Sequence, residues 1–256
     1  MGKYFQVEVK PTISVTALAS GNIANEEILF DWFGFDIPKG SARLIGMTIQ
    51  YKGKNAVDYP PTDFEIFWAK SYRGNPPGTL GGEGGVVDTF TSSWFPNIVG
   101  HTYVDGSQNS NDDDLHIGNI LSVGAVNQGH GSDDELNNNA LVLTGEPDSG
   151  DNVGYDKLYI ASVAKSTHNW GPSTMTIDTT LPSTSSPVIT VADLDAIKAL
   201  SPGDVLRDED NQLIGTVKTI DSATQVTLEA NSASVVAEDK LVYNTTPITF
   251  ILSFER

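Results

Sequence analysis

The histidines are the first side chains in this sequence to consider for chemistry, because an imidazole can bind a metal or move a proton near neutral pH. The chain has four of them, His101, His116, His130 and His168, and all four lie in polar stretches. No two are spaced i,i+4, as two zinc ligands on one face of a helix would be. We therefore expect exposed loop histidines and no metal site.

Two carboxylates, Asp63 and Glu65, share one side of an expected strand that also carries Trp68. Such a pair could hydrolyse a sugar if the fold held the two groups at the required separation. An outward-facing polar side of the strand explains the same spacing, and we favour that interpretation. No Gly-x-Ser-x-Gly motif occurs either, so we assign no catalytic residue and expect no enzyme.

A glycine-rich segment, Gly81-Gly82-Glu83-Gly84-Gly85, superficially suggests a phosphate-binding loop. A phosphate loop leads into a helix and ends in a Lys-Ser/Thr pair, and neither follows here. We expect a flexible loop instead, and we assign no cofactor.

Acidic residues between Asp105 and Asp114 offer many oxygen ligands for calcium. The segment lacks the central glycine and the bidentate Glu of a helix–loop–helix calcium site. Calcium binding by the acidic segment 105–152 therefore stays open, beside the alternative of a solvated surface that maintains solubility.

The composition restricts the kinds of partner. The 256 residues include 33 acidic and 15 basic side chains, which give a net charge of −18. Contacts with phosphates or anionic lipids need surplus Lys and Arg, so we expect neither nucleic acid nor a membrane as partner. The chain has no cysteine, which excludes disulfides, thiolate metal sites and cysteine nucleophiles. Residues 1–6 include no apolar stretch like that of a secretion signal, so we expect a soluble product made in the cytoplasm.

Alternating apolar and polar residues predict strands through the first hundred residues. Such segments begin at Phe5, resume over Ile13–Ala17, and recur over Ile45–Tyr51 and Phe64–Trp68. Residues 28–35 are apolar on both sides, which is typical of a strand covered on both faces. Residues 105–152 are expected to be loop, and strand character returns at 158–163.

The last ten residues form the clearest strand, since Ile248, Phe250, Leu252 and Phe254 share one side. We expect this strand to return to the N-terminal sheet. Residues 188–246 are then a domain inserted into a β-sandwich made of residues 1–187 and completed by 247–256. Within the insertion, Val191–Leu200 is expected to be a short helix capped by Thr190. Four short strands, at 205–207, 213–220, 225–229 and 240–243, predict a small antiparallel β-barrel.

Three stretches resemble proteins of a known class. Residues 28–52, centred on the run from Phe30 to Gly46, and residues 60–70 resemble virion structural proteins of tailed bacteriophages. The stretch from Ser201 to Asn231 is similar to a small β module that recurs in phage head and tail proteins. The resemblance covers under half of the chain, and none of the three stretches is catalytic. It implies an all-β protein with a jelly-roll-like β-sandwich.

The resemblance also implies a function and partners. It points to a head decoration or cement protein that stabilises contacts between capsomers on the outer surface of the capsid. Its partner would be the major capsid protein, and it would be a homo-oligomer, with a trimer favoured. The net charge of −18 agrees with a position away from the packaged DNA.

Two alternatives stay open. One is a tail, neck or fibre-base component of the same kind of particle. The other is a carbohydrate-binding host-adhesion module, because jelly-roll sandwiches often bind sugars and tryptophans can stack on them. Trp32 and Trp68 fall in expected strands and should be core, so Trp94 and Trp170 are the tryptophans to examine.

Overall fold

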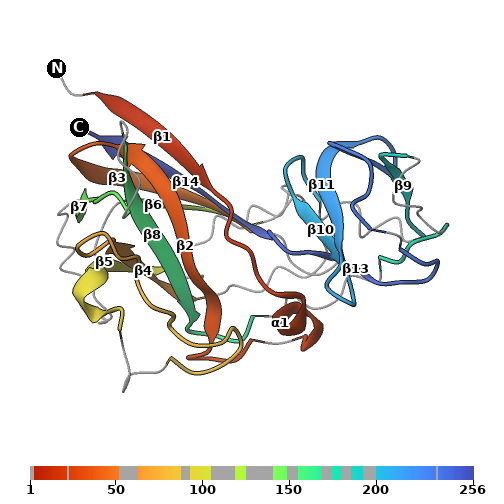
Figure 1. Cartoon of the computed structure of the whole chain (residues 1–256), viewed down its shortest axis with the longest axis horizontal. Coiled ribbons are helices and arrows are strands. Elements are labelled where there is room, and N and C mark those ends of the chain that lie inside the picture. The colour runs from red at the N-terminus through yellow and green to blue at the C-terminus, as the bar shows by residue number, and fades with distance from the viewer. Residues whose placement is uncertain are drawn as a thin grey trace.

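The computed structural model describes residues 3–21, 23–51, 63–87, 93–104, 119–124, 141–148, 155–168, 175–179, 186–192, 200–234 and 236–256. These residues form three antiparallel sheets, and the two chain ends lie close together at one end of the molecule (Figure 1). The predicted all-β class is confirmed. In the described part of the chain, no helix has the length and hydrophobicity needed to cross a membrane.

The first sheet places the last strand in its middle. Its order is β1-β14-β3-β6, and β7 also pairs with β3. The strands are β1 (Tyr4–Val9), β14 (Ile248–Glu255), β3 (Ser41–Tyr51), β6 (Asn119–Gly124) and β7 (Leu141–Thr144). On β14 the apolar side is buried, with Phe250 and Phe254 both 0% exposed. The expected return of this strand to the N-terminal sheet is confirmed by its pairing with β1 and β3.

The second sheet has the order β2-β8-β4-β5. Its strands are β2 (Ile28–Pro38), β8 (Tyr155–Ala164), β4 (Phe64–Lys70) and β5 (Ile98–Val104), which follows the 3₁₀ helix η2 (Phe95–Asn97). As expected from their alternation, Phe64, Ile66 and Trp68 are buried. The two sheets face each other across one core, in which Phe30 and Phe250 have ring centroids 5.9 Å apart.

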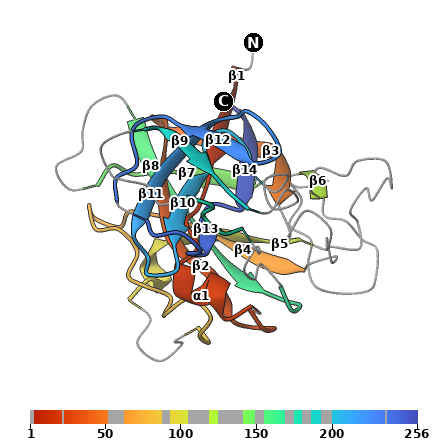
Figure 2. The same cartoon turned by 90° about the vertical axis from the view of Figure 1, so that its right-hand side faces the viewer.

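The connectivity of the sandwich is that of a jelly roll. Leaving β7 aside and numbering the eight remaining sandwich strands in chain order, one sheet runs 1-8-3-6 and the other 2-7-4-5. Figure 2 looks along the long axis of the molecule, with the third sheet in front of this sandwich. The third sheet is built from the chain between the seventh and eighth sandwich strands.

The third sheet has its own core. Its order is β13-β10-β11-β12-β9, with β13 (Val242–Asn244), β10 (Val205–Asp208), β11 (Leu213–Ile220), β12 (Gln225–Leu228) and β9 (Val188–Thr190). Pairing among the named strands runs along this path, and isolated bridges from Thr176 to Leu241 and from Ile177 to Val191 connect residues 176–177 to both of its ends. The core also contains Met175 and Ile177, and the Val242 N–H donates to the Met175 carbonyl at 2.9 Å. Residues of the third sheet's core therefore occur before residue 188, where the inserted domain was expected to begin.

Two expected elements differ in type. Ile13–Ala17 was expected to be strand, but Val15–Ala19 forms the short helix α1, because the Ser14 hydroxyl accepts a hydrogen bond from the Ala17 N–H at 3.2 Å. Val15 and Leu18, three residues apart, are both buried on it. Conversely, strands β6 and β7 occur within the expected loop 105–152, where pairing with β3 supplies their backbone hydrogen bonds.

A β-bulge changes the expected face of β3. Opposite β14, Ser253 pairs with Gly46 and Phe254 with Leu44, so that Ile45 has no partner in the register. Ile45 is therefore 39% exposed, although its alternation with Met47 had predicted a buried side chain. The expected helix Val191–Leu200 falls largely on residues 193–199, which lie outside the described residues.

Candidate functional site

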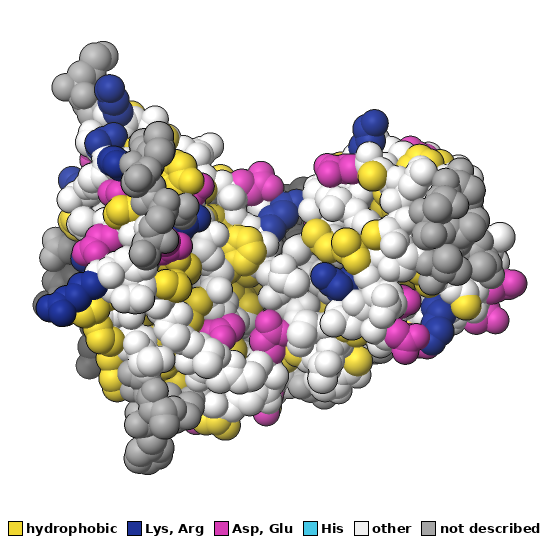
Figure 3. Space-filling model, in the orientation of Figure 1, with side chains coloured by type: hydrophobic (Ala, Val, Ile, Leu, Met, Phe, Trp, Pro, Cys, Tyr) yellow, Lys and Arg dark blue, Asp and Glu magenta, His cyan; other side chains and the backbone are white. Residues whose placement is uncertain are grey.

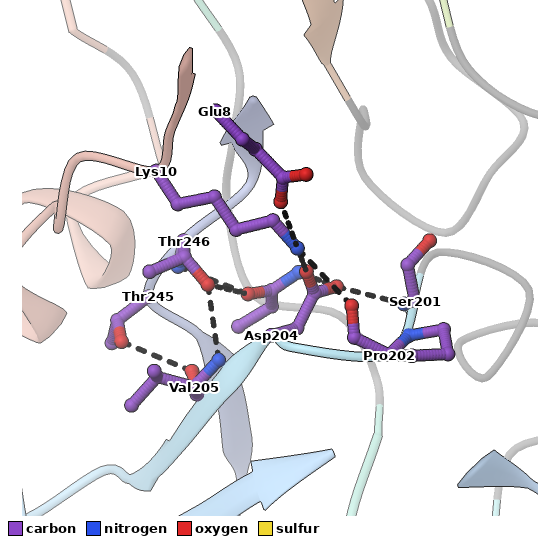
Figure 4. A network of polar contacts seen from close by, with 9 residues as sticks. Glu8, Lys10, Ser201, Pro202, Asp204, Val205, Thr245 and Thr246 are labelled. Carbon is purple, nitrogen blue, oxygen red and sulfur yellow. Dashed lines mark hydrogen bonds and ion pairs between the residues drawn. The ribbon is translucent and has the colours of Figure 1, made fainter. Parts of the chain in front are cut away.

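The most elaborate group of polar side chains described lies where the third sheet joins the sandwich (Figure 4). Lys10 follows strand β1, and its side chain reaches the turn before β10. The Lys10 Nζ donates to the Pro202 carbonyl at 3.1 Å and lies 3.6 Å from Asp204 Oδ1. Glu8 Oε1 lies 3.7 Å from the same ammonium.

The Asp204 side chain is completely buried. Its Oδ2 accepts hydrogen bonds from the Ser201 N–H and from Asn244 Nδ2, both at 2.8 Å. A buried carboxylate is tolerated only when it is paired and hydrogen-bonded, and here Lys10 supplies the positive charge from the other part of the molecule. We call this group, Lys10 with Pro202, Asp204 and Asn244, the polar joint.

Further hydrogen bonds, most of them between a side chain and the backbone, reinforce the polar joint. Thr245 and Thr246 connect β13 to β14, and the Thr246 hydroxyl accepts from the Val205 N–H at 3.0 Å while the Thr245 hydroxyl donates to the Val205 carbonyl at 3.0 Å. The Thr245 carbonyl accepts from the Ile13 N–H at 2.7 Å. Tyr243 of β13 is buried in the core of the sandwich. The two parts are thus tied together by both charge and packing.

The absence of a side chain at Gly203 leaves room for the Lys10 ammonium. The glycine has φ = +86°, in the left-handed region that residues with a Cβ rarely adopt. A Cβ at this position would lie 3.0 Å from the Lys10 Nζ. This glycine lies in the stretch from Ser201 to Asn231 that is similar to a small β module, and nothing in its local pattern indicated a partner near the start of the chain.

The carboxylates that were weighed for sugar hydrolysis have structural contacts. Glu65 lies 3.2 Å from His101 Nδ1 and 3.2 Å from Lys165 Nζ, both on its solvent side of the second sheet. Asp63 lies just before β4, and its carbonyl accepts from the Lys165 N–H at 2.7 Å. These contacts are typical of the polar, solvent-facing side of a strand.

The expectation of an exposed loop histidine is wrong for His168. His168 is 0% exposed, and its Nε2 lies 3.0 Å from the Asp63 carbonyl. Its ring packs edge-on against the Phe64 ring, with the two ring centroids 5.9 Å apart. Burial disfavours the charged imidazolium and lowers the pKa of His168 to about 4. The neutral side chain therefore belongs to the core. His101 is half-exposed, and His116 and His130 lie outside the described residues.

Trp94, a candidate for sugar stacking, is buried. It is 7% exposed and packs in a small core with Ile28, Leu80 and Ala161. Its ring centroid lies 6.4 Å from that of Trp32 and 4.5 Å from that of Phe95. Trp94 therefore offers no open ring face to a ligand. Trp170, the other candidate, lies outside the described residues.

The remaining candidates concern metals and phosphate. Among the described residues no group of three or more His, Asp or Glu side chains is placed to hold a metal ion. The acidic residues 105–118 and 125–140 are outside the described residues, so calcium binding there stays a prediction. The glycine segment pairs with the start of β2, where the Ile28 N–H donates to the Gly85 carbonyl at 2.8 Å. In Figure 3, acidic and basic side chains are intermixed over the visible face.

The fold and the polar joint define an all-β protein in which a jelly-roll sandwich carries a third sheet with its own core. No known family model matches the sequence, and no curated protein matches it.

Proposed function

We propose that the protein is a non-enzymatic structural component of a bacteriophage virion. In this role it decorates the outer surface of the capsid and stabilises contacts between capsomers. Its partners are the major capsid protein and further copies of itself, with a trimer favoured by the resemblance of its sequence to decoration proteins.

One observation carries the proposal: the segments that resemble virion proteins form the scaffold of the molecule. Residues 30–46 make most of β2 and the first half of β3, and residues 64–70 make β4. The segment 201–231 contributes β10, β11 and β12 of the third sheet. Jelly-roll sandwiches are common among capsid and lectin domains, which fits both the proposal and its carbohydrate-binding alternative.

Charge and architecture support an exterior, mechanical role. A protein with a net charge of −18 is repelled by packaged DNA. Two β units tied by the ion pair between Lys10 and Asp204 can bridge neighbouring subunits by buried area alone. Stable contacts of that kind bury more than about 1,000 Å².

The test is the position of the protein in intact particles. Antibodies raised against the purified chain should label the outside of unbroken particles of the phage whose genome encodes it. Labelling that appears only after the shells are opened would contradict the exterior position, and labelling confined to tails would favour a tail or neck component. Retention of the purified protein on a glycan array would favour the carbohydrate-binding module.

A further inference from the structure

Four side chains form a row across the solvent face of the first sheet. In the strand register Tyr4 lies opposite Glu255, Glu255 opposite Arg43, and Arg43 opposite Val142. Residues that lie opposite each other in antiparallel strands point to the same face. The Tyr4 hydroxyl donates to Glu255 Oε1 at 3.2 Å, and Arg43 Nη1 lies 3.7 Å from Glu255 Oε2.

Both ends of this row are apolar and open to solvent. Tyr4 is 69% exposed and Val142 is 55% exposed. Ile45, which the bulge turns outward on β3, is 39% exposed. These three are among the eight large hydrophobic side chains that are exposed in the described part of the chain. Exposed apolar side chains gathered on one sheet face are a feature of contact surfaces.

The order of the row makes it complementary to itself. It runs apolar, negative, positive, apolar, so a second copy presents it in reverse when it is turned by 180° about an axis that is parallel to the sheet and perpendicular to the row. Glu255 of each copy then meets Arg43 of the other, and Tyr4 of each meets Val142 of the other. A two-fold contact requires this property, because the same patch must serve both partners.

A hollow beside Val142 fits the same arrangement. It has a volume of about 310 Å³ and is lined by Ser41, Ala42, Arg43, Val142, Glu255 and Arg256. In the two-fold arrangement the exposed Tyr4 ring of the second copy lies over Val142 and can enter this hollow. The contact then contains two such insertions, one from each copy.

The adjacent row raises no obstacle to a close approach. Gln6 lies opposite Ser253, and Ser253 lies opposite Gly46, so this row is uncharged and partly without side chains. The Gln6 Nε2 donates to the Ser253 hydroxyl at 3.1 Å, which satisfies both groups within one copy. Two sheets can pack face to face on such a surface.

We propose that two copies of the chain associate through this face, with Arg43 of each copy paired to Glu255 of the other and Tyr4 seated beside Val142. The inference departs from the proposed function in one respect, because the proposed trimer also joins copies of the chain but this contact is two-fold. A closed three-fold ring would use two different surfaces of each copy, so this contact and the trimer predict different masses.

The test is sedimentation of the full chain in low salt over a wide range of concentration. The wild type should reach about 55 kDa, twice the 27.4 kDa mass of one chain. Arg43→Glu places two carboxylates opposite each other at both pairs, and Glu255→Arg places two guanidinium groups opposite each other, so each variant alone should stay monomeric. Arg73→Glu, at an exposed arginine outside this face, should dimerise like the wild type.

Mixing the two variants separates a lost contact from a damaged fold. In a one-to-one mixture, both cross-copy pairs again join opposite charges, so dimers should reappear as mixed dimers. A wild type that stays at 27.4 kDa, or a particle of about 82 kDa, overturns the proposal. So does a mixture that remains monomeric. A monomeric wild type would leave a different protein as the occupant of this face.

Discussion

Lys10 and Asp204 form an ion pair that joins the jelly-roll sandwich to the third sheet, with the Lys10 Nζ 3.6 Å from Asp204 Oδ1. Asp204 is completely buried, while 19% of the Lys10 side chain is exposed. The pair therefore matters more than a surface ion pair, because its loss takes the Lys10 ammonium away from a completely buried carboxylate.

The first prediction concerns the charge of Lys10. Lys10→Met keeps an unbranched apolar side chain that is one atom shorter, and it removes the ammonium that faces Asp204. We expect the free energy of unfolding to fall by about 1–3 kcal/mol, less than for an isolated buried pair because Asp204 keeps two other hydrogen bonds. Urea denaturation measures the change, and Lys218→Met, at an exposed lysine of β11, is the control. Equal effects of the two substitutions would contradict the role of Lys10.

The second prediction concerns Gly203. Gly203→Ala forces a Cβ into the left-handed region and places it 3.0 Å from the Lys10 Nζ. We expect a loss of about 1–2 kcal/mol from the backbone alone, with a further loss if Lys10 must move. Gly82→Ala has no heavy atom within 4 Å of its added Cβ and should change the melting temperature much less. Combining Gly203→Ala with Lys10→Met should cost less than the sum of the two, since the displaced ammonium is then absent.

The sequence predicted the sandwich better than the joint, for a physical reason. The face of β14 could be predicted because alternation over eight residues from Ile248 to Glu255 reflects burial on one side of a sheet. The helix α1 was missed because Val15 and Ala17 satisfy a strand pattern as well as a helical one over so few residues. Such a short segment does not distinguish the two periods.

The joint and the buried histidine depend on contacts between distant parts of the chain. Nothing near Lys10 indicates Asp204, because the two meet only after β14 has returned to the first sheet. His168 follows the end of β8 in a polar stretch, yet antiparallel bonds with Ile23 draw it into the core. Local polarity predicts exposure only where no other segment covers the residue.

The third prediction is a dependence of stability on pH. The pKa of His168 is lowered to about 4 in the folded protein, chiefly by burial, from 6.5 for the free side chain. Because the unfolded chain binds the proton more readily, stability is complete above about pH 6.5 and is lost as the pH falls toward 4. We expect the His168 contribution at pH 5 to be about 2 kcal/mol below its value at pH 7.5.

The measurement compares unfolding free energies of the wild type and His168→Gln between pH 7.5 and 4.5. The glutamine does not titrate, so the difference between the two proteins should shrink as the pH falls. Parallel curves for the wild type and His168→Gln would show that the imidazole is not held neutral.

The fourth prediction compares two neighbouring aromatic residues. Trp94 is 7% exposed and Phe95 is 58% exposed. Trp94→Ala should lower the free energy of unfolding by about 3–5 kcal/mol because it leaves a cavity between Ile28 and Leu80. Phe95→Ala should change it by less than about 1 kcal/mol. If Trp94→Ala left stability unchanged, the ring would have to be open to solvent, and sugar stacking by Trp94 would return as a possibility.

The last prediction tests a hydrogen bond inside the sandwich core. The Trp68 Nε1 donates to the Thr102 hydroxyl at 3.0 Å, and both residues are buried. Thr102→Val keeps the shape of the side chain but leaves the indole N–H without this acceptor, which should cost about 1–3 kcal/mol.

Thr102→Ser is the matched control for this bond, because it keeps the hydroxyl and removes one methyl group, at a cost of about 1 kcal/mol. The bond joins β4 to β5 beside the register shift between Trp68 and Ala69, since Trp68 pairs with Gly100 and Thr102 with Ile66. Amide hydrogen exchange in β5 should therefore accelerate in Thr102→Val and not in Thr102→Ser. Equal exchange in both variants would mean that packing of the Trp68 ring alone fixes the pairing of the two strands.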